Sequence, residues 1–107
     1  MITESTLVKL MKGKSRSAFA NLYDSYAAAL WGLILKITPD HRLATEILKD
    51  SFINMEEKRS EYDHSKVKLF SWMVGITMNQ CVKRLRMSRT ELIVKLNSVT
   101  GQSNEKL

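Results

Sequence analysis

Basic side chains cluster near the end of one apolar segment, residues 69–89, which reads LFSWMVGITMNQCVKRLRMSR. If this segment is a helix, steps of three residues place Lys83, Arg86 and, roughly, Arg89 on one side. Arg84 then lies about a hundred degrees round from Lys83. Such cations neutralise phosphates and release counterions, so the pattern indicates a nucleic-acid surface. The alternative is a solvated helix end whose cations complement the negative end of the helix dipole.

Aromatic side chains precede these cations and are interleaved with lysines. Tyr62, Phe70 and Trp72 bracket a stretch that contains Lys66 and Lys68. Rings beside cations suit single-stranded nucleic acid, because bases stack on the rings, at ~1–3 kcal/mol each, while the cations neutralise the backbone. The alternative is that the rings are core anchors. We predict this for Phe70, which falls on an apolar stripe. Trp72 lies nearly opposite, so it belongs to a second packing face or is exposed.

Residues suited to catalysis or metal binding are scattered along the chain. His41 and His64 are isolated, and neither stands at metal-ligand spacing with Cys81. The sequence contains no Gly-rich phosphate loop and no nucleophile motif. We therefore expect a protein that is not an enzyme and that uses no cofactor or metal. Cys81 is expected to pack within a helix interface rather than to react.

Composition and charge bound the remaining classes. The 107 residues fit one domain, with 44% hydrophobic and 26% charged residues and a net charge of +6. The basic excess favours a polyanionic partner such as nucleic acid, or an anionic membrane, and the alternative is an inert basic surface. The chain has a single cysteine, no apolar run of ~20 residues and no secretory signal at its start. These features predict a soluble, cytoplasmic protein without a membrane partner.

Apolar side chains recur at helical spacing, so the elements that position these residues are predicted to be helices. The first covers about residues 4–12 and ends at Gly13. The second covers residues 17–37. The third begins after Thr38, with Thr38 as N-cap, Pro39 at the first helical position and Asp40 favoured by the positive end of the helix dipole. Its buried stripe lies opposite a polar face, which is either solvated or a partner surface and which carries Glu46, Lys49, Asp50 and Asn54.

The second half of the chain is predicted to hold a polar loop and one long helix. The loop covers about residues 57–66, and the helix covers residues 68–88. Residues 90–98 are helical by propensity and either continue that helix or pack separately, and residues 101–107 are expected to be a frayed tail. The predicted fold is all-α, a compact bundle of three main helices and a short N-terminal one. We expect the helical domain to cover residues 1–89, with residues 90–107 as a short helical extension.

Three stretches of the chain resemble a known family. They are AFANLYDSYAAALWGLILKITPD, ATEILKDSFINM and EYDHSKVKLFSWMVGITMNQCVKRLR. In order and spacing they are similar to region 2 of the extracytoplasmic-function sigma factors of bacterial RNA polymerase, over roughly residues 18–88. The positions that carry this resemblance are Phe19, Leu22, Tyr23, Tyr26, Ala44, Phe52, Tyr62, Asp63, Phe70, Trp72, Ile76, Asn79 and Arg86.

The resemblance implies an all-α domain with two surfaces and no cofactor. The helix around residues 43–56 would dock on the β′ clamp helices of RNA polymerase through Glu46, Lys49 and Asp50. Residues 60–86 would open the -10 promoter element and hold its non-template single strand, with a base extruded into a pocket, at a cost of a few kcal/mol per base. The implied DNA-binding residues are Tyr62, Asp63, Lys66, Trp72, Asn79, Lys83, Arg84 and Arg86.

The chain also departs from the family at these surfaces. Lys49 stands where a Gln is usual, Glu56 where a Trp is common, Val67 where a Gly is common and Lys83 where an Asp is common. A complete member carries a second helical domain, region 4, which is not expected after residue 89. One alternative is therefore a degenerate protein-interaction module that binds an anti-sigma-like or regulatory partner. Another is a basic helical protein that binds duplex DNA without polymerase.

Overall fold

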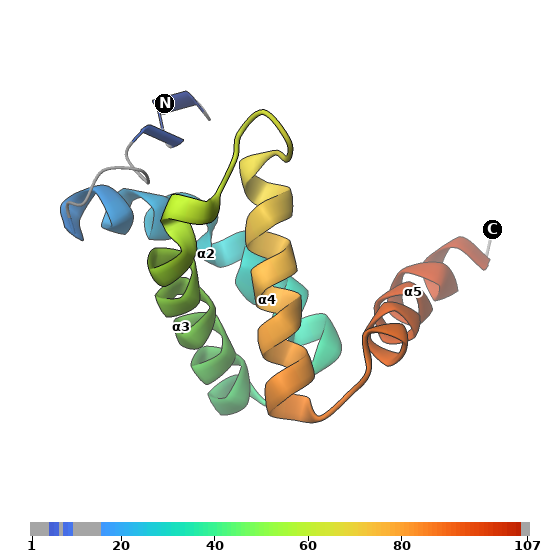
Figure 1. The fold of residues 1–107 in the computed structure, drawn as a ribbon. Helices are drawn as coiled ribbons and strands as arrows, with labels where there is room; N and C mark the ends of the chain where they lie inside the picture. Colours follow the sequence, from blue (N-terminus) through green and yellow to red (C-terminus); the bar gives the residue numbers. More distant parts are fainter. Residues whose placement is uncertain (1–4, 7, 10–15, 106–107) are drawn as a thin grey trace.

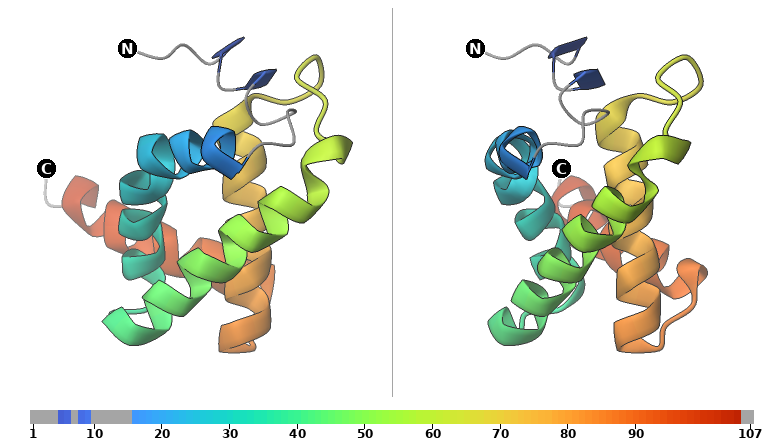
Figure 2. Two further views of the ribbon diagram at one scale, coloured as in Figure 1. Left: turned by 90° about the vertical axis from the view of Figure 1, so that its left-hand side faces the viewer. Right: turned by 60° about the vertical axis from the view of Figure 1, so that its left-hand side comes forward.

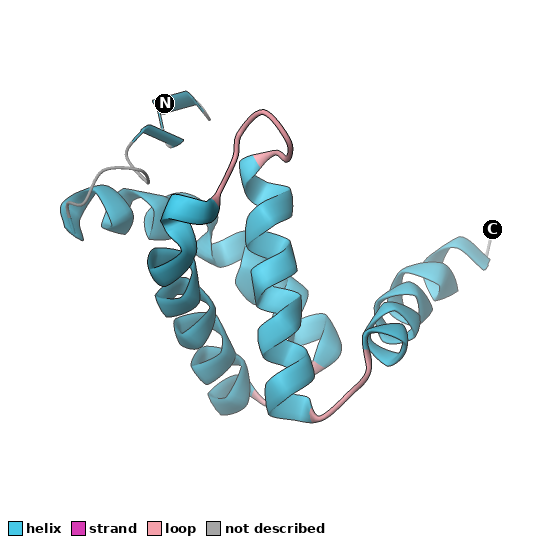
Figure 3. Cartoon of the chain, in the orientation of Figure 1, coloured by secondary structure: helices cyan, strands magenta, loops and turns pink. Residues whose placement is uncertain are grey.

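The computed structural model describes residues 5, 6, 8, 9 and 16–105, and every regular element in those ranges is helical (Figure 3). The elements are α2 (Arg16–Ile37), α3 (His41–Lys58), the short 3-10 helix η1 (Arg59–Glu61), α4 (Leu69–Leu85) and α5 (Arg89–Glu105). The predicted all-α fold class is confirmed. Residues 5, 6, 8 and 9 are helical, as predicted for the first segment, and the other positions of that helix lie outside the described residues.

Helices α3 and α4 lie side by side and run antiparallel, joined at one end by the loop of residues 62–68 (Figure 1). α2 packs against both of them from behind. α5 leaves the far end of α4 and packs against α2 and α4, and it crosses α2 in Figure 2. The two helices that carry predicted polymerase-binding and DNA-binding residues, α3 and α4, therefore pack directly against each other.

The core lies where the predicted apolar stripes meet. No surface is exposed on the core residues Leu22, Ile34, Ile47 and Met73, or on Leu92 of α5. Burial of such side chains contributes about 25 cal/mol per Å² of apolar area removed from water. Because Leu92 is part of this core, residues 90–98 pack as a separate helix on the bundle and do not continue α4. α5 continues as helix through Glu105.

Phe70 is not the core anchor that its place on the stripe predicted. Its side chain is 37% exposed, and its ring stacks on that of Tyr26 with centroids 5.7 Å apart. The reason is that α2 presents small residues, Ala28, Ala29 and Gly32, along the hollow that Phe70 lines. Small side chains leave the ring uncovered on its outer side.

The start of α3 differs from the prediction by two residues. The N-cap is Asp40, whose backbone is extended and whose Oδ1 accepts hydrogen bonds from the N–H groups of Arg42 at 3.0 Å and Leu43 at 3.2 Å. A carboxylate there satisfies two backbone donors that have no partner within the helix, and its charge complements the positive helix end. Thr38 instead accepts a hydrogen bond from the Asp40 N–H at 3.4 Å, before the helix begins.

The fourth helix is shorter than predicted and ends at Leu85. Arg86 adopts a left-handed backbone with φ 54° and ψ 40°, which stops α4. Ser88 and Glu91 then form a capping box, because the Ser88 Oγ accepts from the Glu91 N–H at 3.1 Å and the Glu91 Oε1 accepts from the Ser88 N–H at 3.0 Å. A new helix therefore starts at Arg89, and the predicted single helix over residues 68–88 was wrong at its end.

Candidate nucleic-acid interface

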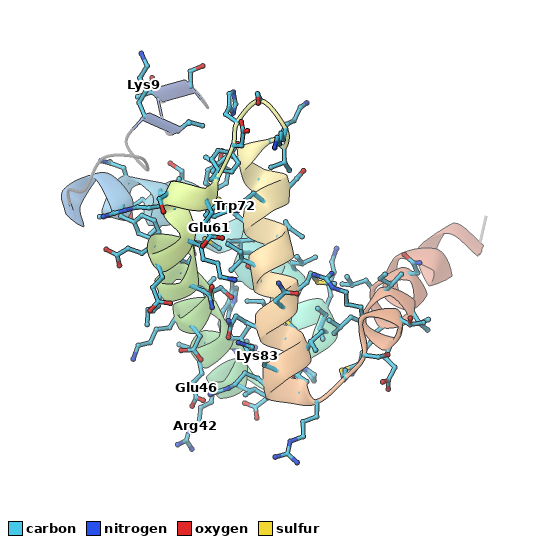
Figure 4. The ribbon with its side chains drawn as sticks, in the orientation of Figure 1. Lys9, Arg42, Glu46, Glu61, Trp72 and Lys83 are labelled. Carbon is cyan, nitrogen blue, oxygen red and sulfur yellow. The ribbon has the colours of Figure 1, made fainter. Side chains whose placement is uncertain are left out.

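One face of α4 carries most of the candidate site. Trp72, Ile76, Asn79 and Lys83 follow one another in steps of four, three and four residues, which keeps them on one side of a helix. In Figure 4 the labelled side chains of Trp72 and Lys83 both lie on the side of α4 next to α3. Between the two helices is a hollow of about 230 Å³, lined by Asn54, Lys58, Ile76, Asn79, Gln80, Val82 and Lys83. Trp72 thus lies on the same face of α4 as Lys83 but does not line this hollow.

Tyr62 lies beneath this face and not on it. Its side chain is 1% exposed, and its hydroxyl donates a hydrogen bond to the Val67 carbonyl at 2.7 Å. Its ring packs against that of half-buried Trp72, with centroids 5.0 Å apart. The prediction that Tyr62 belongs to the exposed DNA surface is therefore corrected in this conformation: Tyr62 supports Trp72 and closes the loop.

The exposed part of the loop is organised by Asp63. Its Oδ1 accepts hydrogen bonds from the Ser65 N–H at 2.9 Å and the Ser65 hydroxyl at 2.6 Å. Its Oδ2 lies 4.0 Å from the Nζ of Lys66, and both side chains are largely exposed. Asp63 thus shapes the turn, and Lys66 presents an exposed cation in the loop.

Arg84 does not extend the row of cations in the groove. Its guanidinium contacts the carboxylate of Glu46 and lies 3.6 Å from that of Asp50, so α4 is joined to the acidic side of α3. Arg42 adds a further cation at 3.9 Å from Glu46. A residue predicted to bind DNA is therefore paired with two residues predicted to bind the polymerase.

The other two arginines also leave the predicted stripe. Arg86 is exposed at the left-handed end of α4, and Arg89 belongs to α5. Arg89 reaches back, and its Nη2 donates to the Oδ1 of Asn79 at 2.7 Å. The predicted stripe of Lys83, Arg86 and Arg89 on one helix was wrong because α4 ends at Leu85, and only Lys83 of the three lines the groove.

The three predicted polymerase-binding residues divide over two sides of α3. Glu46 and Asp50 face Arg84, while Lys49 lines a second hollow of about 440 Å³ between α2 and α3. Phe19, Tyr23 and Ile53 also line this second hollow, and Tyr23 and Ile53 are 43% and 45% exposed. This α2–α3 hollow is the more apolar of the two surfaces that α3 presents.

Two residues that line the α3–α4 groove were not among the predicted site residues. Lys58 was assigned to the loop, but it is the last residue of α3 and lines the hollow. Gln80 is 7% exposed and lines the same hollow. The spacing of Asn54 and Lys58, four residues apart on the polar face of α3, was the signal that pointed to this surface.

Cys81, a remaining candidate for chemistry, is a buried packing residue. Cys81 has no exposed surface, and burial raises the pKa of its thiol to about 11. The described residues contain no group of three or more His, Cys, Asp or Glu side chains that could hold a metal ion. Within the described part of the chain, each helix falls short of the length and apolar character that a membrane span requires.

Comparison with known proteins identifies the family. Residues 22–91 match the model of Sigma-70 region 2. The ECF RNA polymerase sigma factor SigK of Mycobacterium tuberculosis (strain ATCC 25618 / H37Rv) is 24% identical over 80 residues, which are 75% of this chain and 43% of that protein. The ECF RNA polymerase sigma factor SigM of Bacillus subtilis (strain 168) is 27% identical over 73 residues, which are 68% of this chain and 44% of that protein.

The sequence match is limited to part of this chain and part of each relative. No solved structure matches the chain significantly. The chain spans less than half the length of the curated relatives it matches, so the likeness concerns one part of those proteins. The family model covers well over half of the present chain, from within α2 to the capping box of α5. The chain therefore belongs to the sigma-70 region 2 family.

Proposed function

We propose that this chain directs RNA polymerase to promoter DNA through two surfaces and without catalysis. α3 binds the β′ clamp helices of the core enzyme through Lys49 on one side and through Glu46 and Asp50 on the other. The α3–α4 groove and the exposed loop residues Asp63 and Lys66 hold the unpaired non-template strand of the -10 element. Trp72, Asn79 and Lys83 are the α4 residues that contact this strand, and Arg86 contacts its backbone.

The observation that supports this proposal is the alignment of Trp72, Asn79 and Lys83 along one face of α4, with Asn79 and Lys83 lining the α3–α4 hollow. A half-buried ring can stack a base, and lysines at the other end can neutralise phosphates of the same strand. The net charge of +6 adds a sequence-independent attraction for the polyanion. Tyr62 holds the ring from below, so the stacking surface is fixed before a strand arrives.

Fluorescence of Trp72 tests the DNA half of the proposal. Trp31→Phe leaves Trp72 as the single tryptophan, since the chain has two. Titration with a -10-type single strand is expected to quench its emission and to saturate, and the same sequence as duplex is expected to bind less tightly. An emission that single strands leave unchanged would refute the proposed strand contact.

The salt dependence of the same titration distinguishes a direct phosphate contact by Lys83 from a general effect of net charge. Lys83→Ala is expected to flatten the slope of log K against log salt by about 0.7, the value for one phosphate contact on a single strand. The matched control is Lys36→Ala, which removes an equal charge from the α2–α4 hollow far from the groove. Equal slopes for the two variants would remove Lys83 from the strand path.

The second candidate is a protein-interaction module that binds an anti-sigma-like partner. It is favoured by the pairing of Glu46 and Asp50 with Arg84, because this pairing engages both clamp-directed acids and one DNA-directed cation. Pull-down with a fragment carrying the β′ clamp helices distinguishes the two candidates. Capture that is lost in Lys49→Glu supports the first, and no capture together with no strand binding supports the second.

A further inference from the structure

Two exposed apolar side chains are adjacent on α5. Val94 and Ile93 are 60% and 50% exposed, which makes them the most exposed large hydrophobic residues in the described part of the chain. Leu92, next to them, is fully buried, so α5 packs with one face and leaves the opposite face to solvent. On this outer face, Val94 lines an open hollow of about 490 Å³ together with Met87 and Thr90. Adjacent exposed apolar residues beside a hollow are typical of a surface that another protein covers.

The charges beside Val94 indicate which protein fits. A helix with 3.6 residues per turn places Glu91 roughly 60° and Lys95 roughly 100° round from Val94 in the same direction, so an acid and a base share one flank of the outer face. Both side chains are exposed. The Ser88 N–H donates to Oε1 of Glu91 at 3.0 Å, which holds this carboxylate at the start of the helix. The flank therefore carries a negative group and a positive group about 6 Å apart along the helix axis.

This flank is complementary to itself when it is turned round. In an antiparallel pair of helices, a flank of one helix lies beside the same flank of the other, with the residue order reversed. A twofold axis at the height of residue 93 places Glu91 of each copy beside Lys95 of the other, which gives two ion pairs. The same axis brings the two Val94 side chains together between the helices. Twofold pairs in which one patch meets itself are the commonest protein oligomers.

We infer that the outer face of α5 binds a second copy of this chain in an antiparallel helix pair. This inference goes beyond the proposed function and does not depend on it. α5 lies on the side of the bundle away from α3 (Figure 1), so the pairing leaves the α3–α4 groove open in both copies. Two single helices bury less than the ~1,600 Å² of a standard interface, so we expect a weak dimer with a Kd between about 10 µM and 1 mM.

Sedimentation equilibrium of the full chain over that concentration range tests the pairing. The average mass should rise with concentration from that of one chain toward that of two. Lys95→Glu turns each attractive contact into a contact between two glutamates and should weaken association by about ten-fold. It also lowers the net charge by two, so general repulsion between two basic copies would change association in the opposite direction. Lys68→Glu, at the far end of α4 from α5, is the matched control and should associate at least as tightly as the original chain.

A mixture of two variants identifies the antiparallel contact. Glu91→Lys alone should also associate weakly, because each contact then joins two lysines. An equimolar mixture of Glu91→Lys and Lys95→Glu chains should restore association, since each contact again joins a lysine to a glutamate. Circular dichroism checks that each variant folds. Val94→Gln, a change at an exposed position, should weaken association by about ten-fold and replaces the mixture if Glu91→Lys does not fold.

The outcomes that overturn the inference are distinct from those that bear on strand binding. A chain that stays monomeric up to about 1 mM overturns it. Association that Lys95→Glu leaves unchanged also overturns it, and so does a mixture of two folded variants that fails to restore association. None of these results alters the titration of Trp72 with single strands, so the proposed function stands or falls separately.

Discussion

Removing the two carboxylates that hold Arg84 should strengthen the binding of single strands. In the double variant Glu46→Gln/Asp50→Asn, the Arg84 guanidinium keeps its charge but loses both carboxylate partners. The net charge of the chain, which is +6, becomes more positive by two. A released arginine can neutralise one more phosphate, which steepens the slope of log K against log salt by about 0.7. The expected result is tighter binding at low salt, with the advantage fading as salt rises.

The cost of this change to the fold should be small. The side chains of Arg84, Glu46 and Asp50 are 37%, 46% and 38% exposed, so solvent screens their attraction. Pairs at such positions contribute about 0.2–1 kcal/mol each, and this partly exposed network is expected near the low end of that range. Urea unfolding followed by circular dichroism should therefore give a free energy of unfolding within about 1 kcal/mol of the original.

A matched variant separates release of Arg84 from the general effect of charge. Asp24→Asn/Glu56→Gln removes two exposed acids elsewhere on the surface and changes the net charge equally. Fluorescence anisotropy with one labelled strand at several salt concentrations gives the slope for each protein. Adding Arg84→Ala to the first variant should return its slope to the original value. If the two double variants have the same slope, Arg84 is not released onto the strand and the reasoning is wrong.

Three other predictions follow from the described contacts. Tyr62→Phe removes the hydroxyl that donates to the Val67 carbonyl, so it should cost about 1 kcal/mol in urea unfolding and accelerate amide exchange in residues 63–67; unchanged exchange would contradict the anchoring role. Cys81, whose pKa burial raises to about 11, should resist alkylation at pH 8 until the chain unfolds, and rapid labelling of the native protein would count against its burial. Hydrogen bonds from the Ser88 N–H and hydroxyl lower the pKa of Glu91, so its contribution to stability is present above the unfolded pKa near 4.5 and is lost as pH falls through the folded pKa. Acid unfolding of Glu91→Gln, which keeps a capping side chain, should show less of this pH dependence, and identical acid profiles would refute the assignment.

The arrangement of helices was largely predictable because apolar spacing is local information. Apolar side chains at steps of three and four residues predicted the helices, and the structure buries Leu22, Ile34, Ile47 and Met73 of those helices fully. The end of α4 was not predicted, since no Gly or Pro marks it and Arg86 adopts the left-handed backbone itself. A sequence signal for a new helix was present after this point, because Ser88 and Glu91 have the spacing of a capping box.

The candidate site was harder to predict because its geometry depends on tertiary contacts. Arg84 and Glu46 are 38 residues apart, and no local pattern states that they meet. Tyr62 was predicted to belong to the DNA surface as one of the rings that bracket the loop, yet a carbonyl five residues later accepts from its hydroxyl and permits burial. Trp72 and Lys83, by contrast, are eleven residues apart, and this helical spacing is enough to place both on one face of α4.

The burial of Leu92 decides how short a working fragment of this protein can be. The family match ends at residue 91, and a truncation at the predicted boundary of 89 would follow that limit closely. Such a fragment would lose a side chain with no exposed surface and would leave its apolar neighbours open to water. Expression of a minimal piece for crystallisation or screening should accordingly retain α5 through at least this leucine.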